Sequence, residues 1–335
     1  MPHHELIRLF SEIRSGDTAL VGGKGASLGE MAAAGFPVPP GFVVTTAAFD
    51  RFLDETDLAV EVHAELDRLN IEDMKGVEET ARVIRSLFTG AATPSDIGQA
   101  ILGSYEQLGR AMLVAVRSSA TAEDSAAASW AGELETYLNT GKSELLSKVK
   151  ECWASLYSPR ALVYAVDRGF LNNKKNTKKG AKQQPAVAAV KVAVVIQAMV
   201  QSEVAGVAFT VHPVTKDPNQ MIIEAVWGLG EALVSGQVTP DSYVVGKSGR
   251  TLIDTHFTEQ ERQLSRGAPG STDPNVWAKV ATARRTAAKL NTKQIFELAE
   301  ICINIEKHYG APCDIEWAFA KGKFYITQSR PITTL

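Results

Sequence analysis

Residues 117–139 read RSSATAEDSAAASWAGELETYLN and are the most informative stretch of the chain. The apolar segment before them, Ala111–Val116, predicts a strand that delivers Arg117 at its end. The residues that follow are nearly all small, so backbone N–H groups there can approach an anion closely. An arginine side chain binds phosphate oxygens through two parallel hydrogen bonds. The stretch indicates a phosphate site, while a solvated turn after a buried strand is the alternative interpretation.

Residues 21–31 read VGGKGASLGEM and form a second candidate phosphate-binding segment. Lys24 opens a predicted helix that runs through Ala34, with Gly35 at its C-terminal cap. A lysine at a helix N-terminus is unfavourable for the helix dipole unless an anion lies between the two. The segment lacks the four-residue spacer of a Walker motif. A loop that only caps the helix therefore stays open as the alternative.

A C-terminal hairpin is predicted for residues 314–331, which read DIEWAFAKGKFYITQSRP. A three-residue loop at 321–323 would place on one sheet face Glu316, Ala318, Phe324, Ile326, Gln328 and Arg330. A two-residue loop would send Glu316 and Gln328 to opposite faces. In the first register an acid, an amide and an arginine share one surface, which suits magnesium beside nucleotide phosphates. A polar rim at the open end of the hairpin is the alternative.

Composition is typical of a soluble intracellular protein. Of 335 residues, 45% are hydrophobic and 22% are charged, which is enough for one large core or two modest ones. A net charge of −3 gives no general reason to bind nucleic acid or an anionic membrane. The three cysteines match no zinc or redox spacing, and no apolar run is long enough to span a bilayer. These features predict a cytoplasmic chain with reduced thiols.

A lysine-rich segment, residues 171–185, divides the predicted elements into an N-terminal part, 1–185, and a C-terminal part, 186–335. This segment has no acidic residue and no aromatic residue, so a solvated insertion is favoured over a nucleic-acid patch. Helices are predicted for 144–157, from Pro159 onward, for 275–290 and for 292–309, the last closed by Gly310. An apolar strand is predicted for 186–198.

Taken together, the three segments resemble the nucleotide-binding domain of phosphoenolpyruvate synthase, pyruvate phosphate dikinase and rifampicin phosphotransferase. Further matches lie at 41–46 (GFVVTT), 195–200 (VIQAMV), 205–210 (AGVAFT), 227–231 (WGLGE) and 234–241 (VSGQVTPD). The resemblance extends from about Gly22 to Pro331. It implies an α+β, ATP-grasp-like fold in which two subdomains clasp ATP.

The resemblance also assigns roles to individual residues. Lys24, Arg117 and Arg330 are expected on the phosphates of ATP, and Glu316 and Gln328 on Mg2+. Gly132 and Thr136 match a small-residue hairpin over the phosphates, and Gln197 matches a strand that lines the adenine pocket. The sequence departs from the family pattern at Trp130, Glu133 and Leu134. An acid at Glu133 would repel phosphates unless it faces away or meets magnesium.

In the family, the phosphoryl group passes from ATP to a histidine on a swivelling domain and then to a substrate in a barrel domain. None of the six histidines here lies in the family's Gly-Gly-x-x-Ser-His context. The expected partners are therefore a phosphohistidine domain and a phosphoenolpyruvate/pyruvate-binding barrel domain outside this sequence. Three alternatives stay open: a regulatory nucleotide-binding module without chemistry, a rifampicin-phosphotransferase-like ATP domain, and an ATP-grasp ligase that activates a carboxylate.

Overall fold

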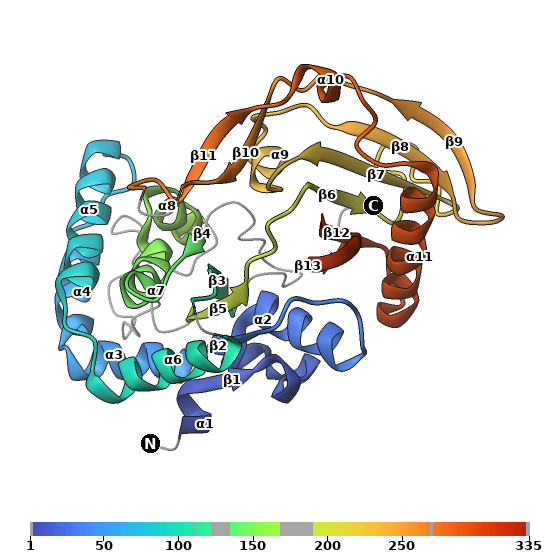
Figure 1. Ribbon diagram of the computed structural model, residues 1–335. Coiled ribbons are helices and arrows are strands. Elements are labelled where there is room, and N and C mark those ends of the chain that lie inside the picture. The colour runs from blue at the N-terminus through green and yellow to red at the C-terminus, as the bar shows by residue number, and fades with distance from the viewer. Residues whose placement is uncertain (1–2, 110, 122–134, 168–189, 269–270, 333–335) are drawn as a thin grey trace. The chain divides into compact units, whose positions relative to one another are not determined.

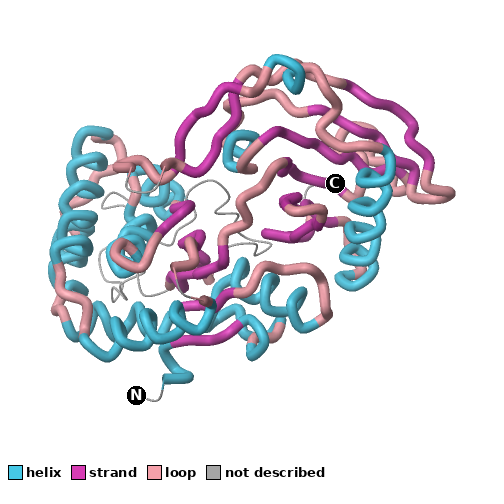
Figure 2. Tube along the Cα trace, viewed as in Figure 1, coloured by secondary structure: helices cyan, strands magenta, loops and turns pink. Residues whose placement is uncertain are grey.

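The computed structural model describes residues 3–109, 111–121, 135–167, 190–268 and 271–332 (Figures 1 and 2). The chain divides into two units. Unit 1 comprises Met1–Gly29 and Pro40–Ala198, and unit 2 comprises Glu30–Pro39 and Met199–Leu335. The predicted boundary at 185/186 and the lysine-rich segment lie outside the described residues. The described helices and the antiparallel sheets confirm the expected mixture of helix and strand.

Unit 1 is built around a five-stranded antiparallel sheet. In sheet order its strands are β1 (Ile7–Leu9), β2 (Gly41–Val44), β5 (Val192–Ala198), β3 (Val114–Ala120) and β4 (Thr136–Thr140). Because side chains alternate along a strand, one sheet face carries Phe42, Val116 and Ile196, which are buried in the core of the unit. The opposite face is the one that carries polar side chains.

Helices other than the one that contains Lys24 cover the apolar face of this sheet. The helices of unit 1 are α1 (His3–Leu6), α2 (Thr18–Ala33), α3 (Thr46–Glu55), α4 (Leu58–Leu66), α5 (Met74–Gly90), α6 (Ser95–Leu108), α7 (Leu145–Ala154) and α8 (Pro159–Asp167). Trp153 of α7 is fully buried, and its ring centroid lies 4.8 Å from that of Phe52. A 3-10 turn, Ser155–Tyr157, extends α7 to the predicted end. Burial of these large rings is a main source of stability for the unit.

Unit 2 contains a six-stranded antiparallel sheet and a separate two-stranded ribbon. In sheet order the large sheet has β13 (Lys323–Pro331), β12 (Cys313–Ala320), β6 (Val204–Phe209), β7 (Gln220–Trp227), β8 (Asp241–Gly246) and β9 (Thr251–His256). The ribbon pairs β10 (Arg262–Arg266) with β11 (Asn275–Lys279). Figure 2 shows the predominance of strand in this unit. It also holds the short helices α9 (Glu231–Val234) and α10 (Thr282–Arg285).

The long helix α11 (Thr292–Tyr309) packs on β7 and β12, as Figure 1 shows for the C-terminal part of the chain. Asn291 caps its first turn by accepting a hydrogen bond from the Gln294 amide at 3.0 Å. Gly310, with φ of 67°, ends it in the left-handed conformation, as predicted. The buried side of α11 presents Leu298 and Cys302 to the sheet core.

The helix predicted for 275–290 is wrong. Asn275–Lys279 forms β11, and only Thr282–Arg285 is helical. The segment contains good helix formers, but Val276 and Trp277 favour a strand, and β10 supplies the partner that pairs with them. Long-range pairing overrides local propensity here.

A buried ion pair anchors the chain that returns from this ribbon. Lys289 donates to Asp241 Oδ1 at 2.7 Å, and both side chains are fully buried. The carboxylate also accepts the backbone N–H groups of Thr258 and Lys289 and the Tyr243 hydroxyl. Every oxygen of Asp241 therefore has a donor, which is the condition under which a buried charge pair is tolerated.

Residues 30–39, which comprise the last turn of α2 and the segment after it, belong to unit 2, although α2 begins in unit 1. The Ile326 amide of β13 donates to the Pro37 carbonyl at 2.9 Å. His308 Nε2 of α11 lies 3.1 Å from Glu30 Oε1, and Phe36 meets the same imidazole edge-on. The end of α2 and the segment after it are thus held by β13 and α11.

All three cysteines are free and buried. Burial raises the pKa of the Cys313 thiol to about 11 and also raises those of Cys152 and Cys302. Thiols of this kind are poor nucleophiles. Within the described ranges, every helix is too short or too polar to cross a bilayer.

Candidate functional site

Three of the predicted site residues share the polar face of the unit 1 sheet. Arg117 on β3 lies opposite Thr136 on β4 and opposite Val195 on β5. Gln197 is two residues along β5 from Val195, so it occupies the same face. The sheet therefore brings together side chains that are far apart in the sequence.

Arg117 is not at the end of a strand, contrary to the prediction. Strand β3 continues through Ser118 and Ser119 to Ala120. The hydroxyl of Ser118 donates to the Glu135 carbonyl and that of Ser119 to the Val21 carbonyl, both at 2.9 Å. These distant partners satisfy two buried hydroxyls, so the polar residues can extend the strand.

The Arg117 guanidinium is held close to the sheet. The residue is 8% exposed, and Nη1 donates a long hydrogen bond of 3.4 Å to Gln197 Oε1. Gln197 is itself 2% exposed, and its Nε2 has no hydrogen-bond partner among the described residues. A buried cation surrounded by little water interacts strongly with an anion that comes within reach. The burial of Arg117 therefore favours a phosphate site over the alternative interpretation, a solvated turn.

Lys24 binds the strand that carries this cation. Its ammonium donates to the Ser118 carbonyl at 2.8 Å, across 94 positions of sequence. The loop before it depends on Gly22, whose φ of 70° breaks α2 into two helical segments. A Cβ at Gly22 would lie 2.2 Å from Ser119 Oγ, so no larger residue fits there. The two candidate phosphate-binding segments are thus in direct contact.

In unit 2, Glu316 and Gln328 lie directly opposite each other on β12 and β13. The turn has two residues, Lys321 and Gly322, both with positive φ. A bulge then makes Thr327 an extra residue of β13, between the pairs Trp317–Ile326 and Glu316–Gln328. The turn is therefore the two-residue one, yet Glu316 and Gln328 share one face, as predicted for the three-residue loop.

Arg330 shares that sheet face and is held by a second acid. Asp314 lies opposite it, and Asp314 Oδ2 accepts a hydrogen bond from Arg330 Nε at 2.9 Å and forms an ion pair with Nη2 at 2.7 Å. Glu224 on β7 falls on the same face, because Val207 of β6 pairs with both Glu224 and Glu316. We call this surface, which carries Asp314, Glu316, Glu224, Gln328 and Arg330, the acidic face. Phe324 and Ile326 are on the opposite, buried face. The prediction that they share a face with Glu316 and Gln328 is therefore wrong.

The carboxylates of the acidic face influence one another. Burial raises the pKa of Asp314, Arg330 lowers it, and the nearby Glu316 raises it again, with a net upward shift. Burial also raises the pKa of Glu224, and the charge of Asp314 adds to this. Partly buried acids that repel one another are stabilised by a cation.

The donor set of the acidic face fits a hard cation. Carboxylate and amide oxygens are the ligands that magnesium prefers, and magnesium takes few of them from protein. Within the described ranges, no three His, Cys, Asp or Glu side chains gather closely enough to form a metal site by themselves. Glu316 and Gln328 thus suit a cation that completes its shell with water and nucleotide oxygens rather than an all-protein cage.

Comparison with known proteins decides the family. Residues 18–335 match the model of the pyruvate phosphate dikinase AMP/ATP-binding domain. The chain belongs to this family. The resemblance inferred from the motifs is therefore confirmed, and ATP is the ligand that membership implies.

The relatives of this dikinase-family domain are phosphoenolpyruvate synthases. The chain is 41% identical to the probable phosphoenolpyruvate synthase of Methanocaldococcus jannaschii, over 99% of this chain and 27% of that protein. It is 42% identical to the probable enzyme of Archaeoglobus fulgidus, over 97% of this chain and 41% of that protein. It is 39% identical to the phosphoenolpyruvate synthase of Pyrococcus furiosus, over 99% of this chain and 44% of that protein. The chain thus spans less than half of the length of these relatives.

Two residues of the acidic face of the dikinase-family domain were missed from the sequence. Asp314 stands two positions before Glu316, and the alternation of a strand would have placed it on the same face. Glu224 had no such signal, because only the order of β12, β6 and β7 brings it there. Gly132, a predicted site residue, and Glu133 lie outside the described residues.

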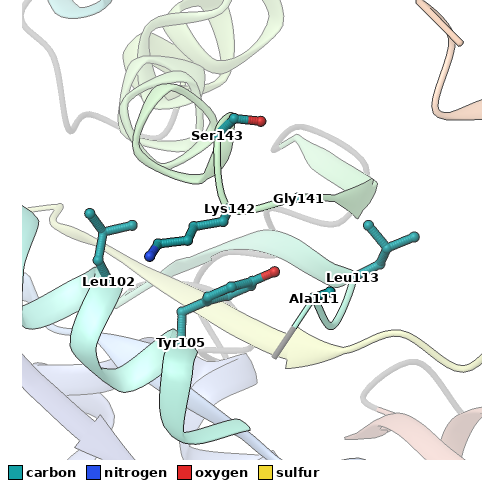
Figure 3. Close-up of a pocket in the computed structure, with 7 residues that line it drawn as sticks. All are labelled: Leu102, Tyr105, Ala111, Leu113, Gly141, Lys142 and Ser143. Carbon is teal, nitrogen blue, oxygen red and sulfur yellow. The ribbon is translucent and has the colours of Figure 1, made fainter. Parts of the chain in front are cut away.

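A surface pocket in unit 1 of the dikinase-family domain is separate from these residues (Figure 3). Leu102, Tyr105 and Leu113 form its apolar wall, and the Lys142 side chain extends across it. None of the residues that line it is a predicted site residue. The Lys142 ammonium pairs with Glu106 at the surface.

Proposed function

We propose that the chain is the ATP-binding phosphotransfer domain of a phosphoenolpyruvate synthase-like enzyme. The observation that carries the proposal is the contact between the two candidate phosphate-binding segments, where Lys24 binds the carbonyl of the residue after Arg117. Family membership supports ATP as the ligand. The names of the relatives support the type of reaction.

In this proposal the fold is ATP-grasp-like, and both units bind one nucleotide. Lys24 and Arg117 of unit 1 bind phosphate oxygens, with Thr136 beside them and Gln197 toward the adenine. Gly132 is assigned to the phosphates by the resemblance alone. Arg330 of unit 2 adds a third cation. Phosphoryl transfer depends mainly on alignment and charge neutralisation, so fixed cations of this kind account for much of the catalysis.

Glu316 and Gln328 would hold Mg2+, which when bound neutralises charge on the phosphates. The acidic face then serves two purposes. Its carboxylates favour the cation, and Asp314 fixes the direction of the Arg330 guanidinium by accepting a hydrogen bond from Nε and pairing with Nη2. A guanidinium that is already oriented loses less entropy when it binds an anion.

The acceptor in this proposal is a histidine on a separate phosphohistidine domain, which hands the phosphoryl group to a substrate in a barrel domain. The relatives extend well beyond the matched region, so further domains exist in them. The reduced, buried thiols are consistent with a cytoplasmic enzyme.

The proposal is tested by product analysis. The chain is mixed with ATP, Mg2+ and the phosphohistidine domain of a relative, and the products are separated by chromatography. Formation of AMP, inorganic phosphate and a phosphorylated histidine domain would support it, because one of the two phosphoryl groups removed from ATP goes to the histidine and the other to water. Release of ADP without histidine labelling would indicate a carboxylate ligase, and binding without turnover would indicate a regulatory module. The same mixture with Arg117→Ala is the control and is expected to give no labelled domain.

A further inference from the structure

The helix that carries Lys24 begins at a glycine, so it has no capping side chain of its own. Gly22 lies outside helical geometry, and the second helical segment of α2 follows it. At an ordinary helix start, the side chain of the capping residue accepts a hydrogen bond from one of the first backbone N–H groups. Gly22 cannot supply that acceptor. Another residue must satisfy the amide of Gly25.

Ser119 supplies the missing cap from strand β3. Its Oγ accepts the Gly25 amide at 3.1 Å and donates to the Val21 carbonyl at 2.9 Å. One hydroxyl thus binds the chain on both sides of Gly22, across 94 and 98 positions of sequence. The residue is fully buried, so no water competes for these bonds. Ser119 fixes the Gly22–Gly25 loop to the strand that carries Arg117.

We propose that Ser119 is a positioning residue that holds Lys24 beside Arg117 for phosphate binding. This inference rests on the proposed function. Ser119 and Arg117 are two residues apart on β3 and share one sheet face. The loop that Ser119 caps delivers Lys24 to the Ser118 carbonyl. Without the cap, the loop would move away from β3, and Lys24 would lose its fixed relation to Arg117.

The chain offers a matched control for the loss of a buried hydroxyl. Ser155 is 1% exposed, and its Oγ donates to the Cys152 carbonyl at 2.7 Å. It lies in the 3-10 turn between α7 and α8, and its hydroxyl donates to a carbonyl of α7 rather than to the glycine loop or β3. Ser119→Ala and Ser155→Ala each remove one buried hydroxyl, but only the first releases the loop that carries Lys24.

The experiment measures the dissociation constants of ATP and of adenosine for the unaltered chain and both variants, by calorimetry and by competition. Ser119→Ala is expected to weaken ATP binding about tenfold, the effect of one or two hydrogen bonds. Adenosine binding should stay within about twofold, because adenosine has no phosphate for Lys24 to bind. Ser155→Ala should leave both constants unchanged. Hydrogen exchange at the Gly25 amide should be faster in Ser119→Ala alone.

The outcomes separate this inference from the proposed function. Normal ATP binding by Ser119→Ala, or an equal loss for ATP and adenosine, would overturn the positioning role and leave the proposed function intact. Failure of the unaltered chain to bind ATP would overturn both. If Ser119→Ala does not fold, Ser119→Cys tests the same contact, because a thiol is close in size to the hydroxyl but is a weak hydrogen-bond donor and acceptor. That variant should also weaken ATP more than adenosine, and equal weakening would contradict the inference.

Discussion

Glu316 and Gln328 lie opposite each other because Thr327 is an extra residue in β13. With a two-residue turn and a regular ladder, Glu316 would pair with Thr327, and Gln328 would pair with Ile315 on the buried face. The bulge at Thr327 shifts the remaining pairs by one position. It thereby keeps Gln328 and Arg330 on the acidic face and Ser329 in the core.

Deletion of Thr327 should therefore keep the acidic face intact. The shortened β13 would form a regular ladder with the same pairing of Glu316 and Gln328, so we expect a folded chain that retains Mg2+-dependent ATP binding. Deletion of Ser329 is the contrasting variant, because it would put Arg330 opposite Ile315 in the core. An unpaired buried charge of this kind destabilises by about 3–5 kcal/mol. Thermal unfolding and ATP affinity check both, and equal damage from the two deletions would contradict the assigned register.

Replacement of Arg117 should remove most of the affinity for ATP. Hydrogen bonds to charged groups contribute about 1.5–3 kcal/mol, so Arg117→Ala is expected to weaken binding by roughly 10- to 100-fold. Arg117→Lys should recover only part of this, because an ammonium lacks the planar fork. A thermal-shift assay with ATP measures the effect. Arg160→Ala, which removes an exposed arginine of the same unit, is the control. Full protection of Arg117→Ala by ATP would exclude the residue from the site.

The acidic face should make stability depend on pH in a defined direction. The pKa of Glu224 is raised above its ordinary 4.5 and that of Asp314 above 3.8, chiefly by burial. The folded chain then binds these protons more tightly than the unfolded chain does. As the pH rises from the unfolded towards the folded pKa, these groups lower the free energy of unfolding.

Glu224→Gln removes one of these titratable carboxyl groups. As the pH rises through that interval, the free energy of unfolding of the variant should therefore increase relative to that of the unaltered chain. Urea unfolding at several pH values measures the difference. Glu259→Gln, which changes an exposed glutamate of the same unit, is the control. A difference for Glu224→Gln that is constant or that falls with pH would refute the assigned burial.

The buried pair of Asp241 and Lys289 should be essential for the stability of unit 2. Lys289→Met leaves the Asp241 carboxylate buried without its counter-ion, so we expect a loss of about 3–5 kcal/mol in the free energy of unfolding. Arg250→Met removes a cation from an exposed pair with Glu300, and the expected loss is about 0–1 kcal/mol. Urea unfolding compares the two variants. Similar small losses would show that water reaches Asp241.

Several site features could be predicted from the sequence because they depend on local patterns. The strand alternation around Glu316 and Gln328, the glycine before Lys24 and the end of α11 at Gly310 are of this kind. The continuation of β3 past Arg117 could not be predicted, because it depends on the carbonyls of Glu135 and Val21, which only the folded chain brings to Ser118 and Ser119. The bulge at Thr327 and the place of Glu224 likewise follow from strand pairing.

Residues 30–39 have a consequence for how this protein can be divided. Pro37 binds β13 and Glu30 binds α11, both in unit 2. In the sequence, however, residues 30–39 come before residues 40–198, which form most of unit 1. Cleavage after Ala198 would therefore leave fragment 199–335 with an uncovered surface at Ile326 and His308. Fragment 1–198 would contain residues 30–39 without the strand and helix that bind them. The two units are therefore not continuous segments of the sequence. Expression of unit 2 alone would have to include residues 30–39 together with residues 199–335.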